Sequence, residues 1–231
     1  MTITDRTPAF VLGDSFTALG VLQILGRQQI PVFVLTEANS AIRSSRYFAE
    51  FTVDGTRCDS PDDLPSFLES LVIERAVLIP CSDEYALAVS RLPEFLQSRF
   101  PSSSPDTVTI NRLVDKLQLA ELMRTLSLPH AESIAVDSAD LVRELAAESG
   151  RHGFLKPRNS QPFFRDFATK AFWYESEQNA LELYEKAVAG GHAMIWQEYV
   201  DGPPTRHFYV EGYIDRHGET KATYARRRLR M

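Results

Sequence analysis

The 231-residue chain is 44% hydrophobic and 24% charged, a composition typical of a globular protein with one large or two small domains. Its formal net charge of -6 at pH 7 disfavours a nucleic-acid partner, because neutralising phosphates requires clustered Lys and Arg. The two cysteines, Cys58 and Cys81, are too few for a disulfide framework or a structural zinc site.

The first hundred residues alternate short apolar runs with stretches of helical periodicity. Apolar runs that end in turn residues predict buried strands at 9–12, 32–35 and 76–79. Helical patterns occur at 17–28, 61–71 and 83–91, and Ser82 is placed to cap the last of them. Because strands that alternate with helices indicate crossover units, this region is predicted to be an α/β domain with a parallel sheet.

A Ser/Pro-rich segment at 101–106 is the predicted linker to a second region, in which helices and strands follow one another in a different pattern. Helices are predicted there at 114–126, 139–149 and 176–189, the last capped by Ser176. Strands are predicted at 153–156, 169–174, 194–200, 207–214 and 220–229. A turn at His217-Gly218 would join the last two strands, so this second region is expected to be α+β.

Several classes of site and location are disfavoured by missing patterns. No run approaches the roughly 18 apolar residues of a spanning helix, and residues 1–8 lack a signal-peptide pattern, so we expect a cytoplasmic protein without a membrane partner. The five histidines lack metal-ligand spacing, and no Walker A sequence occurs. The turn at 13–20 lacks GxGxxG spacing, which favours a tight packing turn over a dinucleotide site. Asp83 and Glu84 follow a strand end, where α/β sheets place clefts, but helix capping alone explains them and is the favoured interpretation.

Three landmarks occur in order in the second region. Asp115-Lys116 lies at the start of a predicted helix, and Phe154-Leu155-Lys156-Pro157 places a lysine at the end of an apolar strand. The run Ile195-Trp196-Gln197-Glu198-Tyr199-Val200 then leads into Asp201-Gly202-Pro203. Each landmark alone is weak, since an exposed lysine on a helix is usually a solvated charge and a Lys-Pro pair usually just ends a strand.

In this order and spacing, the landmarks resemble the ATP-grasp superfamily, in particular its carboxylate–amine ligases. The resemblance implies a Rossmann-like parallel-sheet domain over 1–106, a small nucleotide-binding subdomain over 107–200, and the first strands of the large subdomain over 201–231. It implies that Lys116 and Lys156 contact the nucleotide phosphates. It also implies that a hinge strand contacts adenine through backbone groups at a free strand edge, with these residues: Gln197, Glu198, Tyr199 and Val200. The backbone role predicts that Gln197→Ala has little effect.

The sequence departs from the family pattern in the loop after the second lysine. That loop is normally rich in glycine, so that backbone amides approach the phosphates, but residues 158–167 contain none. Side chains such as Ser160 and Arg165 would replace those backbone contacts. Because the loop holds aromatic residues and no glycine, we expect 158–166 to be a mobile lid whose Phe163 and Phe164 find partners only on closure.

Two further departures concern the ribose and the metal. Residues 202–207 contain no acid for the ribose hydroxyls, so ribose binding is unassigned. The family's magnesium ligands are expected beyond Met231, so the 231-residue chain is expected to be inactive by itself and to associate through an exposed strand edge as a homo-oligomer. Arg226 and Arg228 are candidates for contacting the phosphates or an acyl phosphate, although an arginine-rich edge that discourages strand pairing explains them too.

The sequence therefore predicts the ATP-binding part of a ligase that uses ATP and Mg²⁺ to join a small-molecule carboxylate to an amine through an acyl phosphate. Two alternatives stay open. One is a catalytically silent ATP-binding module. The other is a nicotinamide-dependent oxidoreductase, against which the missing GxGxxG spacing argues.

Overall fold

In a computed structural model that describes residues 6–36, 40–51, 57–148 and 152–229, the first sheet has three parallel strands in the order β2-β1-β3. They are β1 (Ala9–Leu12), β2 (Val32–Leu35) and β3 (Val77–Pro80). Every residue of the central strand β1 is buried, because successive side chains point into cores on opposite faces of the sheet. The predicted parallel sheet is confirmed.

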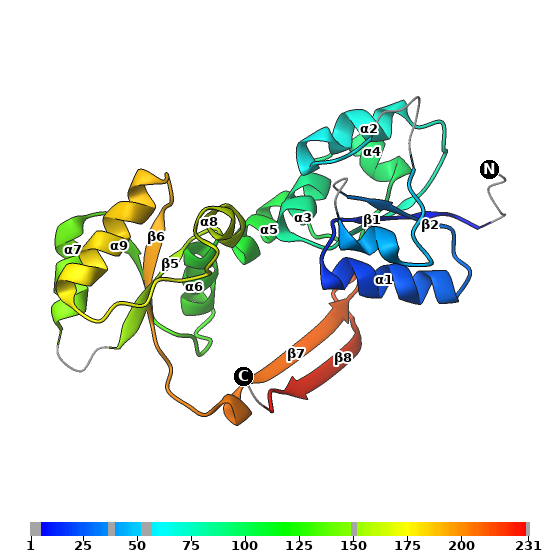
Figure 1. Cartoon of the computed structure of the whole chain (residues 1–231). Coiled ribbons are helices and arrows are strands. Elements are labelled where there is room, and N and C mark those ends of the chain that lie inside the picture. The colour runs from blue at the N-terminus through cyan, green and yellow to red at the C-terminus, as the bar shows by residue number, and fades with distance from the viewer. Residues whose placement is uncertain (1–5, 37–39, 52–56, 149–151, 230–231) are drawn as a thin grey trace.

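Helices cover both faces of this sheet (Figure 1). They are α1 (Phe16–Arg27), α2 (Leu64–Ser70), α3 (Asp83–Ser90) and α4 (Glu94–Arg99), with short 3-10 turns η1 (Ala41–Ser44) and η2 (Pro61–Asp63). Phe10 and Leu12 pack in a core with α2 and α4, whereas Val11 packs with α1. Ser82 caps α3 as predicted, since its hydroxyl accepts from the Tyr85 amide at 3.3 Å.

The predicted linker at 101–106 lies against the first sheet. The Leu78 amide donates to the Pro101 carbonyl at 2.9 Å, and a parallel bridge joins Leu78 to Ser102. Asp106 then caps α5 (Thr107–Val114), with its carboxylate accepting from the Val108 amide at 2.9 Å. The connection is therefore held at both ends by hydrogen bonds.

The second sheet is antiparallel, with strand order β4-β6-β5. Its strands are β4 (Ser133–Val136), which the sequence did not predict, β5 (Gly153–Pro157) and β6 (Met194–Glu198). One face packs against α7 (Ala139–Ala147) and α9 (Glu177–Ala189), and the core between them includes Leu155, Met194 and Trp196. The opposite face carries Lys156 and Gln197, because side chains alternate along a strand.

The helix predicted at 114–126 is confirmed as α6 (Lys116–Thr125), which begins two residues later than predicted because Asp115 has an extended conformation and caps it. The preceding helix α5 was not predicted. Two other predicted elements of this region are wrong. The strand predicted at 169–174 is a single bridge between Phe172 and Leu155. The loop predicted at 158–166 forms α8 (Ser160–Phe167), which Ala168 ends in a left-handed conformation at φ 53°.

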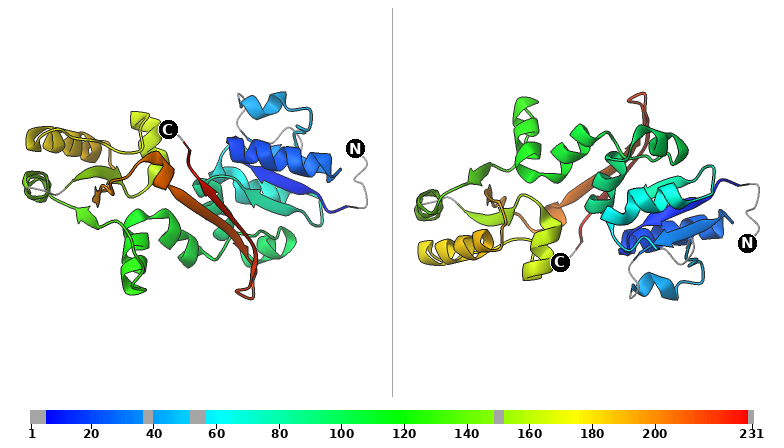
Figure 2. Two further views of the ribbon diagram at one scale, coloured as in Figure 1. Left: turned by 90° about the horizontal axis from the view of Figure 1, so that it is seen from below. Right: turned by 90° about the horizontal axis from the view of Figure 1, so that it is seen from above.

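A β-hairpin follows the second sheet after η3 (Pro204–Arg206). It pairs β7 (Phe208–Ile214) with β8 (Thr220–Arg227), and Gly218 at φ 80° allows the predicted turn between them. Every residue of both strands is exposed, and the hairpin extends from the second sheet toward the first (Figures 1 and 2). Among the described residues, no helix has the length and apolar character needed to cross a bilayer.

Candidate nucleotide-binding site

Lys116 is fixed against the segment that follows β5. Its backbone amide donates to the Arg158 carbonyl at 3.3 Å, and its ammonium nitrogen donates to the same oxygen at 3.2 Å. The Arg158 guanidinium in turn donates from Nε to the Asp115 carboxylate at 3.1 Å. Because Asp115 also caps α6, these contacts hold the start of that helix beside the end of β5.

Lys156 lies on β5 between Leu155 and Pro157, which are both buried. The alternation of the strand places its side chain on the opposite face, where Nζ donates to the Gln197 side-chain oxygen at 3.2 Å. The Gln197 amide nitrogen donates to the Ser133 hydroxyl at 3.0 Å. A polar chain thus joins all three strands of the second sheet and orients the lysine.

Three lysines form a concentrated positive charge at this end of the sheet. Burial lowers the pKa of Lys116, as does the positive charge of Lys156, while Asp83 and Asp115 partly compensate. Burial also lowers the pKa of Lys156, and the charge of Lys170 lowers it further. Lys170 follows α8 and was not identified from the sequence. Half-buried ammonium groups that repel one another favour an anionic ligand, which would relieve the repulsion.

An aromatic wall stands beside Lys156 and consists of Phe154, Trp173 and Tyr199. The rings of Phe154 and Trp173 are 4.7 Å apart, and those of Trp173 and Tyr199 are 5.3 Å apart. The Lys156 nitrogen is 5.9 Å from the Phe154 ring centre. Trp173 is 59% exposed, so an aromatic ring surface is available to a ligand next to the positive charge.

The backbone of the predicted hinge differs from the expected free edge, because β6 is the middle strand of its sheet. The Glu198 amide donates to the Glu132 carbonyl at 2.9 Å, and the Tyr199 amide donates to the His152 carbonyl at 2.8 Å. The Glu198 carboxylate accepts from the Glu132 amide at 3.0 Å. Within the described part of the chain, the first amide after β6 without a hydrogen bond is that of Val200.

Ser160 begins α8, so most of the loop expected at 158–166 is a helix, and its mobility stays a prediction. Phe163 is fully buried, and its ring packs against Phe167, Phe172 and His192 at 4.7 to 5.2 Å between centres. Phe163 therefore belongs to the core of the second sheet, whereas Phe164 is 46% exposed. The first amides of α8 lack intrahelical partners and are suited to phosphate oxygens, which offers a physical substitute for the missing glycines.

The two candidate arginines are not brought together with the lysines by any described contact. Arg226 lies on β8, donates to the Glu211 carboxylate at 2.6 Å and stands 5.0 Å from the Tyr209 ring centre, both on the same hairpin. The Arg228 amide donates to the His207 carbonyl at 2.9 Å. The described contacts of Arg226 lie within the hairpin, and the assignment of both arginines to the same ligand as the lysines stays a prediction.

Across the described residues there is no group of three or more His, Cys, Asp or Glu side chains that suits a metal ion. The acidic residues nearest the lysine cluster, Asp83 and Asp115, act on the lysine charge, and Asp115 is occupied by Arg158. The described residues therefore assign no magnesium ligands.

The chain is similar to several solved structures, although not to any family model or curated protein. Among solved structures, an N5-carboxyaminoimidazole ribonucleotide synthetase with bound ADP matches at a TM-score of 0.68 and 16% identity, over 96% of this chain and 55% of that one. The enzyme of the same name from Thermus thermophilus matches at 0.62 and 18%, over 94% and 52%. Phosphoribosylglycinamide synthetase from Anaerococcus prevotii matches at 0.56 and 13%, over 96% and 51%.

The chain shares the fold of about half of each of these synthetases. The resemblance inferred from the sequence is confirmed at the level of fold, because the match runs over both sheets and the hairpin. The chain spans about half the length of the solved structures it matches. At these identities the comparison shows the shared fold alone.

Proposed function

We propose that this chain binds ATP across the exposed face of its second sheet. The lysine cluster, which comprises Lys116, Lys156 and Lys170, holds the phosphates together with the first amides of α8 at Ser160. The adenine ring lies on the aromatic wall and accepts a hydrogen bond from the Val200 amide. The observation that carries the proposal is that two half-buried lysines, Lys116 and Lys156, lie close to each other and beside an exposed aromatic surface on one sheet face.

The proposed reaction of the whole protein is ATP-dependent joining of a carboxylate to an amine. A carboxylate oxygen attacks the γ-phosphorus, the bond to the β-phosphate oxygen breaks, and ADP leaves. The amine nitrogen then attacks the acyl carbon, loses a proton, and releases inorganic phosphate. The lysine cluster contributes the positive charge that stabilises the transferring phosphoryl group. Mg²⁺, when bound, would neutralise further phosphate charge.

Two solved structures that are similar to this chain support the proposed ligase reaction. One solved synthetase structure contains ADP and 5-aminoimidazole ribonucleotide, and another contains ATP. Their ligands motivate a nucleotide in this fold and an amine as its co-substrate. Arg226 and Arg228 remain proposed contacts of the acyl phosphate, which would require the hairpin to approach the lysine cluster.

A thermal-shift panel of ATP, ADP, NAD and NADP tests the proposal. A ligand at one hundred times its dissociation constant stabilises the folded state by about 2.7 kcal/mol, which is readily measured. We expect ATP and ADP to raise Tm and both nicotinamide nucleotides to have no effect. Equal shifts with NAD would favour an oxidoreductase. ATP binding without ADP formation from any carboxylate and amine, in this chain and in a C-terminally extended version, would favour a silent module.

A further inference from the structure

The side chain of Gln197 on β6 contacts the lysine cluster directly. Gln197 is half-buried and lies on the face of the second sheet opposite to Trp196, which packs in the core. Its Oε1 accepts a hydrogen bond from the Lys156 ammonium at 3.2 Å, and its Nε2 donates to the Ser133 hydroxyl at 3.0 Å. These side-chain contacts are separate from the backbone role that the sequence resemblance implies for this residue.

Ser133 on β4 determines which way the Gln197 amide points. Ser133 is only 3% exposed, and its hydroxyl donates to the Ala131 carbonyl at 3.3 Å. The Ser133 oxygen is therefore left to accept from the Gln197 nitrogen, which turns the Gln197 oxygen toward Lys156. A half-turn of the amide would set its NH₂ group against the ammonium, and both groups are donors. One orientation of the amide is thus favoured.

The amide orients Lys156 without neutralising its charge. Burial and the positive charge of Lys170 lower the pKa of Lys156, and among the described residues no carboxylate offsets them. An ammonium group has three donors, and Gln197 takes one of them. Two donors and the full positive charge of Lys156 therefore remain for a ligand.

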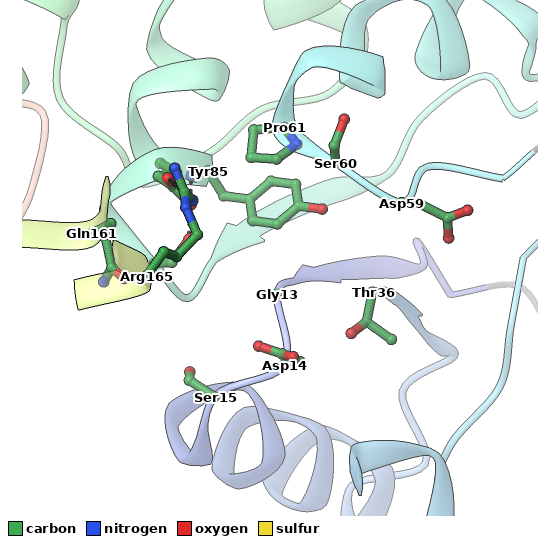
Figure 3. Close-up of a pocket in the computed structure, with 12 residues that line it drawn as sticks. Gly13, Asp14, Ser15, Thr36, Asp59, Ser60, Pro61, Tyr85, Gln161 and Arg165 are labelled. Atoms are coloured by element: carbon green, nitrogen blue, oxygen red, sulfur yellow. Dashed lines mark hydrogen bonds and ion pairs between the residues drawn. The ribbon is translucent and has the colours of Figure 1, made fainter. Parts of the chain in front are cut away.

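The two arginines that follow Lys156 in the chain already have carboxylate partners. Arg158 donates from Nε to Asp115 at 3.1 Å, and Arg165 pairs with Glu84 at 2.7 Å. Arg165 lines a cavity of about 280 Å³ at the carboxyl ends of the first sheet (Figure 3). Because the charges of both arginines are engaged, the charge of Lys156 counts for more in attracting an anion.

We infer that Gln197 is a positioning residue for Lys156, which holds the ammonium group in place and leaves its charge to the phosphates. This inference rests on the proposed function, in which Lys156 contacts the phosphates. It adds a determinant of specificity, because a neutral acceptor at this position does not compete with an anionic ligand. It also reverses the small effect expected for Gln197→Ala from a backbone role alone.

Two substitutions of Gln197 separate orientation from charge. Gln197→Ala removes the acceptor of the ammonium group, so the Kd for ATP should rise about 3- to 10-fold. Gln197→Glu places a carboxylate beside the ammonium group, where it competes with the phosphates, so the Kd should rise roughly tenfold or more. Adenosine lacks phosphates, and its Kd should not change. Gln178→Glu, at an exposed position of α9, is the matched control and should leave both Kd values unchanged.

Two further measurements distinguish positioning from a merely structural role. In the full chain with ¹³C-labelled lysine, NMR titration of the Lys156 Cε signal reports the pKa of Lys156 without nucleotide, and Lys156→Met identifies that signal. Gln197→Glu should raise this pKa, because an adjacent carboxylate favours the charged ammonium, whereas Gln178→Glu should not. In a Lys156→Met background, Gln197→Ala should cause no further loss of ATP affinity, because it acts only through the lysine.

The inference is overturned by wild-type ATP affinity in both folded Gln197 variants, by an unchanged Lys156 pKa in Gln197→Glu, or by additive losses in the double variant. Ser133→Ala provides a second route if a Gln197 variant does not fold. It removes the group that turns the amide, so it should weaken the binding of ATP but not of adenosine, and unchanged ATP binding would contradict the inference.

The outcomes also separate this inference from the proposed function. If Lys156→Met weakens ATP binding and the Gln197 variants do not, the nucleotide assignment stands and the role of Gln197 is wrong. If Gln197→Glu raises the pKa of Lys156 but the wild-type chain does not bind ATP, the pairing of the two side chains stands and the nucleotide assignment is wrong.

Discussion

Replacing Lys156 by methionine removes one positive charge and keeps most of the apolar stem that packs beside Phe154. In the free protein this lysine donates to a neutral acceptor, the Gln197 side-chain oxygen, at 3.2 Å, and its burial lowers its pKa. The variant loses one hydrogen bond and also loses a charge that is unfavourably placed. We therefore expect its stability without nucleotide to change by less than about 1 kcal/mol.

Nucleotide binding should change much more than stability. A hydrogen bond from an ammonium group to a phosphate contributes about 1.5 to 3 kcal/mol. Lys156→Met should consequently raise the Kd for ATP roughly 10- to 150-fold. Lys116→Met should have a smaller effect, because Lys116 lies at the start of a helix, whereas Lys156 is fixed on a strand between two buried residues. Adenosine has no phosphate, so its Kd should be unchanged in both variants.

Isothermal titration of ATP and adenosine into the wild-type chain and both variants measures these values. Lys186→Met is the matched control, because Lys186 is an exposed lysine on α9, which packs against the other face of the second sheet. A folded Lys156→Met protein that binds ATP with wild-type affinity would refute the phosphate assignment. A loss of adenosine binding equal to the loss of ATP binding would show that the substitution acts through the fold.

The remaining predictions concern the hinge, the sheet and the charge. Val200→Pro, which removes an amide donor, should weaken ATP and adenosine binding alike in the same titrations, and normal binding by a folded variant would exclude this amide. Gly153→Ala should lower the free energy of unfolding by about 1 to 3 kcal/mol in urea, because its Cβ would lie 2.2 Å from the Trp196 ring. Gly20→Ala is the control, since nothing lies within 4 Å of its Cβ, and it should be neutral or stabilising. The pKa values of Lys116 and Lys156 are both lowered in the folded protein, so just below pH 10.5 the unfolded chain binds more protons than the folded one. The free energy of unfolding of the wild type, relative to that of the Lys116→Met/Lys156→Met variant, should therefore rise with pH in that range. A flat difference in urea unfolding between pH 8 and pH 10 would contradict this last prediction.

The local elements were largely predictable because their signals lie within a few residues. The four-residue apolar run of β1 could only be a strand buried on both faces, and Ser82 and Ser176 cap their helices as expected. Lys156 could be assigned because it interrupts an apolar strand. The fold class followed from the order of these elements.

Other features depend on contacts between distant segments. The apolar positions of α8 indicate a helix only once Phe163 is known to face Phe172, so family expectation favoured a loop at this place. The central position of β6 depends on β4, a short strand with little sequence signal. Lys170 carries no motif at all, and it belongs to the site only because the chain returns to Lys156 after α8.

Trp173 is a further residue of the candidate site that the sequence did not identify. A tryptophan after a run of mixed polarity is more typical of core packing than of an exposed binding surface. The aromatic wall becomes visible only from the distances between the Trp173 ring and the rings of Phe154 and Tyr199. Trp173 also provides a probe, because Trp196, the other tryptophan, is 1% exposed and packed in the core. Fluorescence quenching by ATP that disappears in Trp173→Phe would locate the nucleotide beside it.

The most direct test of the central claim is a crystal structure of this chain with a non-hydrolysable ATP analogue such as AMP-PNP. The account predicts phosphate oxygens within hydrogen-bonding distance of the Lys116 and Lys156 ammonium groups and of the first amides of α8. It predicts the adenine ring on the aromatic wall, with the Val200 amide donating to a ring nitrogen. A nucleotide bound instead at the turn formed by Gly13 and Asp14, with the lysine cluster left in solvent, would contradict it.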